Sequence, residues 1–188
     1  MVKPLLVIFT GVPGSGKTYF ALRLADKISA LRLNSDAMRL AIFGSLENIE
    51  ATYHSPRREM LNTHTFGAMD YAATQALSMG TSVVYEAIQQ TVRDRRHMEE
   101  LARVCDAQLV LVSVVVDLET AITRTMQREA ADDARQFYEQ KAREVVMHFN
   151  DTFEPLERTD YTVEIDGTLS FNEQYRVFQQ KVDRLNVI

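Results

Sequence analysis

Short aliphatic runs alternate along this chain with longer segments whose apolar residues recur at helical spacing. The runs predict strands at residues 5–10, 31–33, 82–85, 109–116 and 161–165. The segments between and after them predict helices at residues 19–28, 35–43, 56–78, 92–105, 118–129, 133–149 and 171–185. Residues 43–55 show no clear periodicity, so no element is predicted there.

Such alternation is typical of a parallel sheet whose two faces are covered by helices. Residues 109–116 (LVLVSVVV) are nearly continuous in aliphatics, as in a strand buried on both faces, so we expect this strand to be central. No internal repeat or linker divides the sequence. The predicted fold is a single three-layer α/β domain over residues 1–188, with a mostly parallel five-stranded sheet.

Composition narrows the class of protein without naming a function. The chain has 188 residues, of which 46% are hydrophobic and 25% charged, enough for one domain with a full core. It has no 18-residue apolar run and no cleavable signal pattern, so we expect a soluble, cytoplasmic protein without a membrane partner. One cysteine excludes an internal disulfide framework, and a net charge of −5 gives no overall attraction to nucleic acid.

Chemistry enters directly after the first predicted strand. Residues 11–18 (GVPGSGKT) fit the phosphate-binding pattern G-x-x-x-x-G-K-[ST] at every fixed position, between a strand and a helix. Glycines at these places let the backbone aim successive N–H groups at an anion. An ordinary glycine turn is the alternative, but it does not require Lys-Thr after the last glycine. The predicted nucleotide-binding residues are Gly11, Val12, Pro13, Gly14, Ser15, Gly16, Lys17, Thr18 and Tyr19.

The side chains that end this loop have separate roles. Lys17 supplies a mobile positive charge for the β and γ oxygens of a nucleoside triphosphate, and Thr18 supplies a hydroxyl for Mg²⁺. The helix that begins here adds the positive end of its dipole. The motif therefore predicts ATP and Mg²⁺ as ligands.

A second candidate site follows the second predicted strand. The sequence Asn34-Ser35-Asp36-x-x-Arg39 places Asp36 and Arg39 three residues apart, on one face of the first helical turn. Asp36 would orient a substrate hydroxyl and take its proton, while Arg39 would bind an anionic or polar part of the same molecule. The alternative is that Asp36 caps a helix and Arg39 is a solvated surface charge.

These two motifs resemble those of the P-loop kinase family that includes polynucleotide 5′-kinases, chloramphenicol phosphotransferase and zeta-toxin-type sugar-nucleotide kinases. The resemblance implies the P-loop NTPase fold with a helical lid. It implies that Asp36 is the general base, that Arg39 contacts the acceptor, and that Arg124 and Arg128 are lid arginines that act on the transferring phosphates. Where the family often has Asp after its third strand, this chain has Glu86, a candidate substrate or water-mediated Mg²⁺ contact.

The lid also has a physical basis, because phosphoryl transfer needs charge neutralisation and exclusion of water. Arg124 and Arg128 are four residues apart, and residues 130–133 offer a break before the next helix, which predicts a lid at about 124–147 with Arg135 as a third candidate. The alternative is a solvent-exposed helix face with a pair between Arg128 and Asp132. Residues 166–168 (DGT) are either an adenine contact or a simple glycine turn.

The sequence thus predicts an ATP-dependent phosphotransferase that moves the γ-phosphate to a hydroxyl acceptor, with a small molecule favoured. One alternative is a polynucleotide 5′-hydroxyl kinase, which the acidic charge balance disfavours. Another is an ATPase or nucleotide-switch module that acts through a protein partner. The chain lacks the N-K-x-D motif of GTPases, which argues against that second alternative.

Overall fold

The structure is a computed structural model that describes residues 3–127, 139–157 and 159–185. Its strands are Leu5–Thr10 (β1), Leu31–Asn34 (β2), Val83–Ile88 (β3), Gln108–Val115 (β4) and Thr162–Asp166 (β5). Its helices are Lys17–Lys27 (α1), Ser35–Phe43 (α2), Leu46–Tyr53 (α3), Arg58–Ser78 (α4), Val92–Val104 (α5), Leu118–Met126 (α6), Glu139–Asp151 (α7) and Phe171–Leu185 (α8).

The strands form one five-stranded sheet in the order β2-β3-β1-β4-β5, and all of its described pairings are parallel. The α/β prediction is confirmed, and the sheet is more regular than the mostly parallel one expected. Residues 109–116 were expected to form the central strand, but the strand they form, β4, lies next to the central one. β1 is in the middle, and β4 is an interior strand because β5 covers its outer edge.

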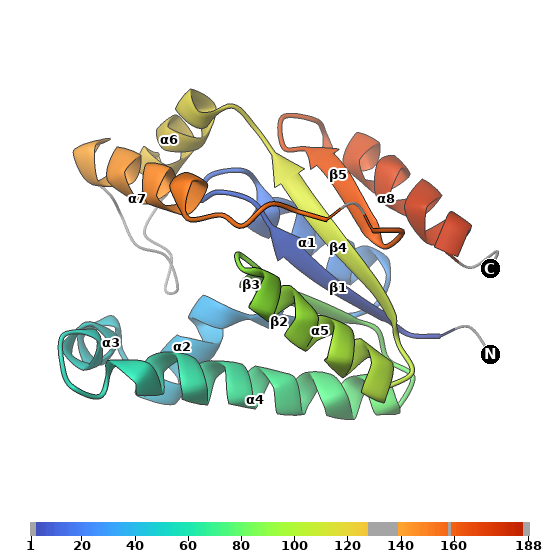
Figure 1. The fold of residues 1–188 in the computed structure, drawn as a ribbon, viewed down its shortest axis with the longest axis horizontal. Helices are drawn as coiled ribbons and strands as arrows, with labels where there is room; N and C mark the ends of the chain where they lie inside the picture. Colours follow the sequence, from blue (N-terminus) through green and yellow to red (C-terminus); the bar gives the residue numbers. More distant parts are fainter. Residues whose placement is uncertain (1–2, 128–138, 158, 186–188) are drawn as a thin grey trace.

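Helices cover both faces of the sheet (Figure 1). On one face, α4 and α5 pack over strand residues that include Leu6, Ile8 and Tyr85. On the other face, α1 and α8 pack over residues that include Val7 and Phe9. Alternate residues of β1 thus enter opposite cores, as the period of two in a strand requires. The result is the predicted three layers.

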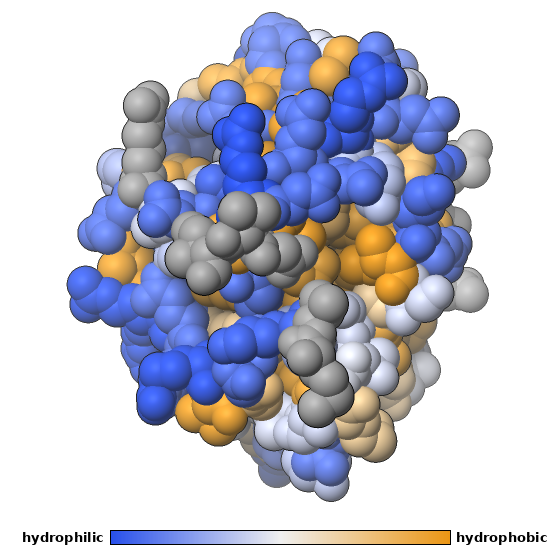
Figure 2. All heavy atoms as spheres, turned by 90° about the vertical axis from the view of Figure 1, so that its right-hand side faces the viewer, coloured by the Kyte–Doolittle hydropathy of each residue, from blue (hydrophilic) through white to orange (hydrophobic). Residues whose placement is uncertain are grey.

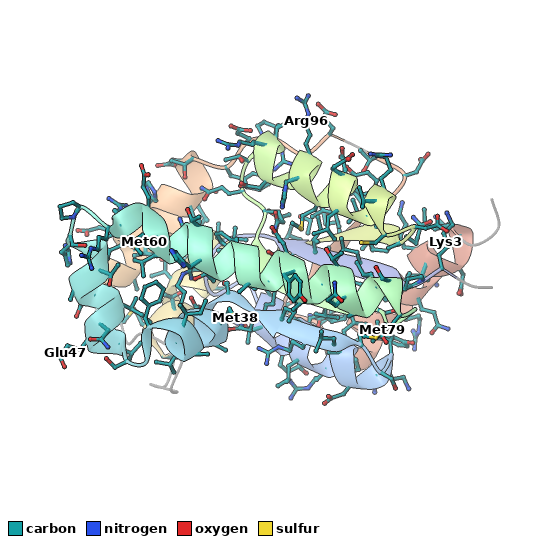
Figure 3. The ribbon with its side chains drawn as sticks, turned by 90° about the horizontal axis from the view of Figure 1, so that it is seen from below. Lys3, Met38, Glu47, Met60, Met79 and Arg96 are labelled. Carbon is teal, nitrogen blue, oxygen red and sulfur yellow. The ribbon has the colours of Figure 1, made fainter. Side chains whose placement is uncertain are left out.

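The helix that the periodicity did not predict is α3, within residues 43–55. Gly44 ends α2 in a left-handed conformation, and the Ser45 side chain then caps α3 by accepting from the Asn48 N–H. Both signals were readable in the sequence. Helix α3 packs against α4. Figure 3 shows α4 running along the molecule from near Met60 toward Met79, with Met38 of α2 beside it.

Figure 2 shows the face that lies on the right in Figure 1, toward the amino ends of the strands. Hydrophilic side chains cover much of this face, and apolar side chains form smaller groups between them. Met79 and Val104 are among the exposed apolar residues of the molecule. Within the described ranges, no helix is both long enough and apolar enough to cross a membrane.

Candidate nucleotide and acceptor site

The strands all point their carboxyl ends to one edge, and the candidate residues lie along it. In Figure 1 this edge faces left, with α6 and α7 above it and α2 and α3 below it. β1 has β3 on one side and β4 on the other, so the loop after β1 lies where the strand order changes direction. Ligands of open α/β sheets bind at such a switch point.

Three positions in the loop of residues 11–16 have backbone conformations that favour glycine. Gly11, Gly14 and Gly16 have φ values of 132°, 80° and 106°. A Cβ added to Gly11 would lie 2.4 Å from the carbonyl oxygen of Val114, and one added to Gly14 would lie 2.1 Å from that of Ala121. The loop is therefore pressed against β4 and α6, and its shape is set by the backbone rather than by side chains.

The Lys17 ammonium group lies across this loop. Its Nζ donates to the carbonyl oxygens of Gly11 and Val12, both at 2.8 Å, so it is positioned to exchange these acceptors for phosphate oxygens. Thr18 and Tyr19, on the exposed first turn of α1, follow it. The Arg23 guanidinium stacks on the Tyr19 ring at 3.9 Å, which leaves Tyr19 at the surface beside the loop.

Arg124, at the end of α6, reaches the far side of the phosphate loop. Its Nη1 donates to the carbonyl oxygen of Gly167 at 3.0 Å, and the same atom lies 3.9 Å from a Cβ built on Gly16. Gly167 itself touches the loop, since a Cβ added to it would lie 2.0 Å from the carbonyl oxygen of Ser15. Hydrogen bonds from Thr168, with a smaller contribution from Arg124, lower the pKa of Asp166.

On the other side of β3, Asp36 and Arg39 meet as their spacing predicts. The Arg39 Nη1 donates to Asp36 Oδ1 at 2.9 Å, and the Asp36 side chain is 49% exposed, so a ligand can reach it. Asp36 does not cap α2, because Asn34 does: its Oδ1 accepts from the Ala37 N–H at 2.8 Å. The carboxylate is thus free of that structural task.

Two residues of α4 extend this pair. The Arg39 Nη2 donates to Asn62 Oδ1 at 3.2 Å, and the guanidinium lies 5.6 Å from the centre of the Phe66 ring. Arg39 is therefore held between α2 and α4 by three different contacts. Asn62 is 23 residues away in sequence, and nothing in the sequence pattern marks it as part of this site.

Glu86 lies between these two groups, on β3. Its carboxylate is paired with Arg32 of β2, with Oε2 at 2.7 Å from Arg32 Nε and 2.6 Å from Arg32 Nη2. The glutamate is buried, and it lies on the α1 side of the sheet, as Val84 does. The sequence indicates Glu86 as a site residue but gives no sign of its partner Arg32, because the two residues are 54 positions apart.

An arginine near the start of α5 has a structural role. Arg95 is buried and donates to the carbonyl oxygens of Gln89, Gln90, Glu154 and Pro155 at 2.9 to 3.3 Å. It ties the end of β3 to the segment that follows α7.

The predicted lid at about 124–147 is only partly within the described residues. Arg128 and Arg135 lie outside them, so the structure places Arg124 alone of the predicted lid arginines. The structure thus groups Lys17, Thr18 and Arg124 around the phosphate loop. It places Asp36 and Arg39 two strands away, at the same edge.

No cluster of three or more His, Cys, Asp and Glu side chains suited to a metal occurs in the described part of the chain. A Mg²⁺ ion that is bound together with a nucleotide typically keeps several waters and takes phosphate oxygens with only one or two protein ligands. The Thr18 hydroxyl, at the start of α1, and the Glu86 carboxylate, near the end of β3, are two oxygen groups at this edge of the sheet.

A protein family described as an AAA domain matches residues 6–156 of this sequence. The match covers most of the chain, so the chain belongs to this family. It includes the phosphate loop, the Asp36–Arg39 pair and Glu86.

Several solved kinases share the fold. A gluconokinase from Sinorhizobium meliloti 1021 superposes with a TM-score of 0.65 at 17% identity, covering 99% of this chain and 95% of that one. A Mycobacterium tuberculosis APS kinase in complex with AMPPNP and APS gives 0.66 at 17% identity, covering 97% and 99%. A sugar kinase from Janibacter sp. HTCC2649 gives 0.65 at 17% identity, covering 97% and 95%. The fold is therefore that of P-loop kinases, as the resemblance predicted.

Among curated proteins, a tRNA dimethylallyltransferase from Azorhizobium caulinodans is 35% identical over 79 residues. The match covers 39% of this chain and spans about a quarter (24%) of that protein.

Proposed function

We propose that this protein is an ATP-dependent phosphotransferase that moves the γ-phosphate to a hydroxyl group of a small molecule. The observation that carries the proposal is the arrangement along the carboxyl edge of the sheet. A phosphate loop follows β1, and an exposed carboxylate with its own guanidinium partner follows β2. A module that only hydrolyses or senses a nucleotide has no need of the second group.

The loop and its neighbours would bind the nucleotide. Backbone N–H groups of the loop, those of Gly14 and Gly16 among them, and the amino end of α1 would face the phosphates, and Lys17 would move from the loop carbonyls to the β and γ oxygens. Thr18 would hold Mg²⁺, which when bound neutralises charge on the phosphates. Arg124 adds a positive charge beside Gly16 and Gly167.

The Asp36–Arg39 pair would serve the acceptor. Asp36 accepts the proton of the acceptor hydroxyl as that oxygen forms a bond to the γ-phosphorus. The bond between the γ-phosphorus and the bridging oxygen breaks, and ADP leaves with that oxygen. Arg39, already held by Asn62 and Phe66, orients the acceptor through a polar or anionic group.

Three considerations support this function over its alternatives. The family match covers both motifs, and the kinases named above share the fold. Gluconokinase and APS kinase are, by their names, enzymes of small acceptors. The net charge of −5 gives no overall attraction to a nucleic-acid backbone.

The test is transfer of labelled γ-phosphate from Mg·ATP to a panel of small hydroxyl compounds and, in parallel, to a 5′-hydroxyl oligonucleotide. Asp36→Asn should bind ATP normally but lose transfer by about 100-fold or more. Lys17→Ala should lose nucleotide affinity and turnover together.

Label on a small molecule that depends on Asp36 supports the proposal and identifies the acceptor class. Label on the oligonucleotide, with a steep loss of activity as salt rises, would replace the small molecule by a polynucleotide. ATP hydrolysis that depends on Lys17 but not on Asp36, with no acceptor labelled, would contradict a kinase and favour the ATPase module.

A further inference from the structure

The ion pair between Arg32, which is partly exposed, and the buried Glu86 has no part in the steps proposed above. Arg32 lies opposite Val84 in the register of β2 with β3, and Val84 faces the core under α1. Glu86 is two residues further along β3, so both charged side chains lie on the α1 side of the sheet. This is the side on which the phosphate loop runs into α1.

The backbone of β3 is irregular at this glutamate. Ile8 pairs with Tyr85, but the next residue, Phe9, pairs with Ile88, so Glu86 and Ala87 have no partner on β1. A bulge of this kind re-aims side chains and is common beside functional sites. Glu86 thus keeps its register with Asn34 of β2 but leaves the ladder on the side of β1, the strand that leads into the phosphate loop.

The hydrogen bonds of the pair are one-sided. Both Arg32 donors go to Oε2, at 2.7 and 2.6 Å, and the described residues give Oε1 no hydrogen-bonding partner. A buried carboxylate requires a compensating cation, which Arg32 supplies. Two donors on Oε2 anchor that oxygen, and so they restrict where the second oxygen of the carboxylate can lie.

We propose that Arg32 is a positioning residue that fixes Glu86 so that Oε1 is available to the Mg²⁺ shell of a bound nucleotide. The inference rests on the proposed function, in that the phosphate loop must bind Mg·ATP. The side chain of a glutamate is flexible, and the contact with Arg32 restricts that flexibility.

The competing interpretation is a structural tie that only joins β2 to β3. The two interpretations differ in how nucleotide binding responds to magnesium. A structural tie would change stability and would weaken binding equally with and without the metal. A positioning role would weaken only the part of the affinity that magnesium adds.

The experiment measures binding of a non-hydrolysable ATP analogue by calorimetry, once with Mg²⁺ and once with EDTA. The variants are Arg32→Met, Arg32→Lys, Glu86→Gln and the double variant Arg32→Met with Glu86→Gln. Arg103→Met is the matched control, because Arg103 forms a comparable but exposed pair with Glu100 on α5. Thermal unfolding of each variant without ligand reports on folding.

We expect Arg32→Met to lose roughly tenfold or more of the magnesium-dependent gain in affinity, with EDTA values unchanged. Glu86→Gln should lose a similar amount, the double variant no more than either single one, and Arg32→Lys should restore part of it. Arg103→Met should match the wild type. If Arg32→Met does not fold, Glu86→Asp serves instead, because it keeps the carboxylate but shortens its reach to Arg32.

Equal loss with and without magnesium, or a double variant that loses the sum of both single effects, would overturn the inference. Because no acceptor is used, failure to find a phosphorylated product would count against the proposed function and leave this result standing. Normal wild-type binding with an unaffected Arg32→Met would count against this inference alone.

Discussion

The phosphate loop after β1 and the Asp36–Arg39 pair after β2 lie at the same edge of the sheet, but different contacts hold them. The loop is held through its backbone, with Gly11 and Gly14 against carbonyl oxygens of β4 and α6. The pair is held through side chains, by Asn62 and Phe66 of α4.

This difference matters for function. A loop shaped by backbone contacts tolerates few substitutions. This suits the binding of a triphosphate, because the triphosphate is the same in every reaction of this class. A site made of side chains from several helices changes with each substitution, which suits the acceptor. One scaffold is thereby able to serve many acceptors.

The largest expected effect comes from adding one methyl group to the loop. Gly14→Ala places a Cβ 2.1 Å from the Ala121 oxygen at a φ of +80°, so the loop must move. We expect turnover and nucleotide affinity to fall by roughly 100-fold or more, measured by steady-state kinetics and calorimetry.

Gly80→Ala is the matched control for that change. Gly80 also has a positive φ, 78°, but an added Cβ meets nothing within 4 Å. It should cost about 1–2 kcal/mol of unfolding free energy and leave activity unchanged. Equal losses of activity in both variants would show that strain, rather than the close approach to α6, is responsible.

On the acceptor side, Arg39→Met should raise the KM for the acceptor by about tenfold to a hundredfold, because a charge-assisted hydrogen bond is lost. The dissociation constant of the nucleotide should not change. Asn62→Ala, which removes only a support of Arg39, should have a smaller effect in the same direction. A change in nucleotide affinity in either variant would contradict the separation of the two regions.

A smaller effect is expected from the cap of α2. Asn34→Ala removes the acceptor for the Ala37 N–H and should lower the unfolding free energy by about 1 kcal/mol. Asn34→Asp keeps an acceptor and should restore most of it. Denaturant unfolding measures both, and acceptor KM should follow the same order.

The smallest effect concerns the common scaffold. Burial, followed by the hydrogen bond to Glu99, raises the pKa of Tyr161 from 10 to about 12. The folded protein therefore keeps the Tyr161 hydroxyl proton up to a higher pH than the unfolded chain does. Its contribution to stability is complete below pH 10 and is lost as the pH rises toward 12. Tyr161→Phe should make this decline shallower, as measured by urea unfolding across that range, and a decline of unchanged slope would contradict it.

How much the sequence predicts follows from how each region is held. The loop was predictable because its backbone conformation demands glycine at fixed spacing, and the contact of Asp36 with Arg39 because three residues make one helical turn. The ion pair between Arg32 and Glu86 was not predictable, because it joins two strands across the sheet.

The order of the strands was the other source of error. An aliphatic run such as residues 109–116 shows burial on both faces, but an interior strand next to the middle has the same burial as the middle strand. The missed helix α3 is different, because its signals, Gly44 and Ser45, were local and present.

The close approach of Gly167 to Ser15 has a consequence for how the protein is made. The phosphate loop leaves the ribosome before the turn after β5 that confines it, because the loop precedes that turn in the sequence. Nascent chains that lack β5 and α8 carry the whole nucleotide motif without the carbonyl and glycine contacts that enclose it. Nucleotide binding should therefore appear only after β5 has joined the sheet.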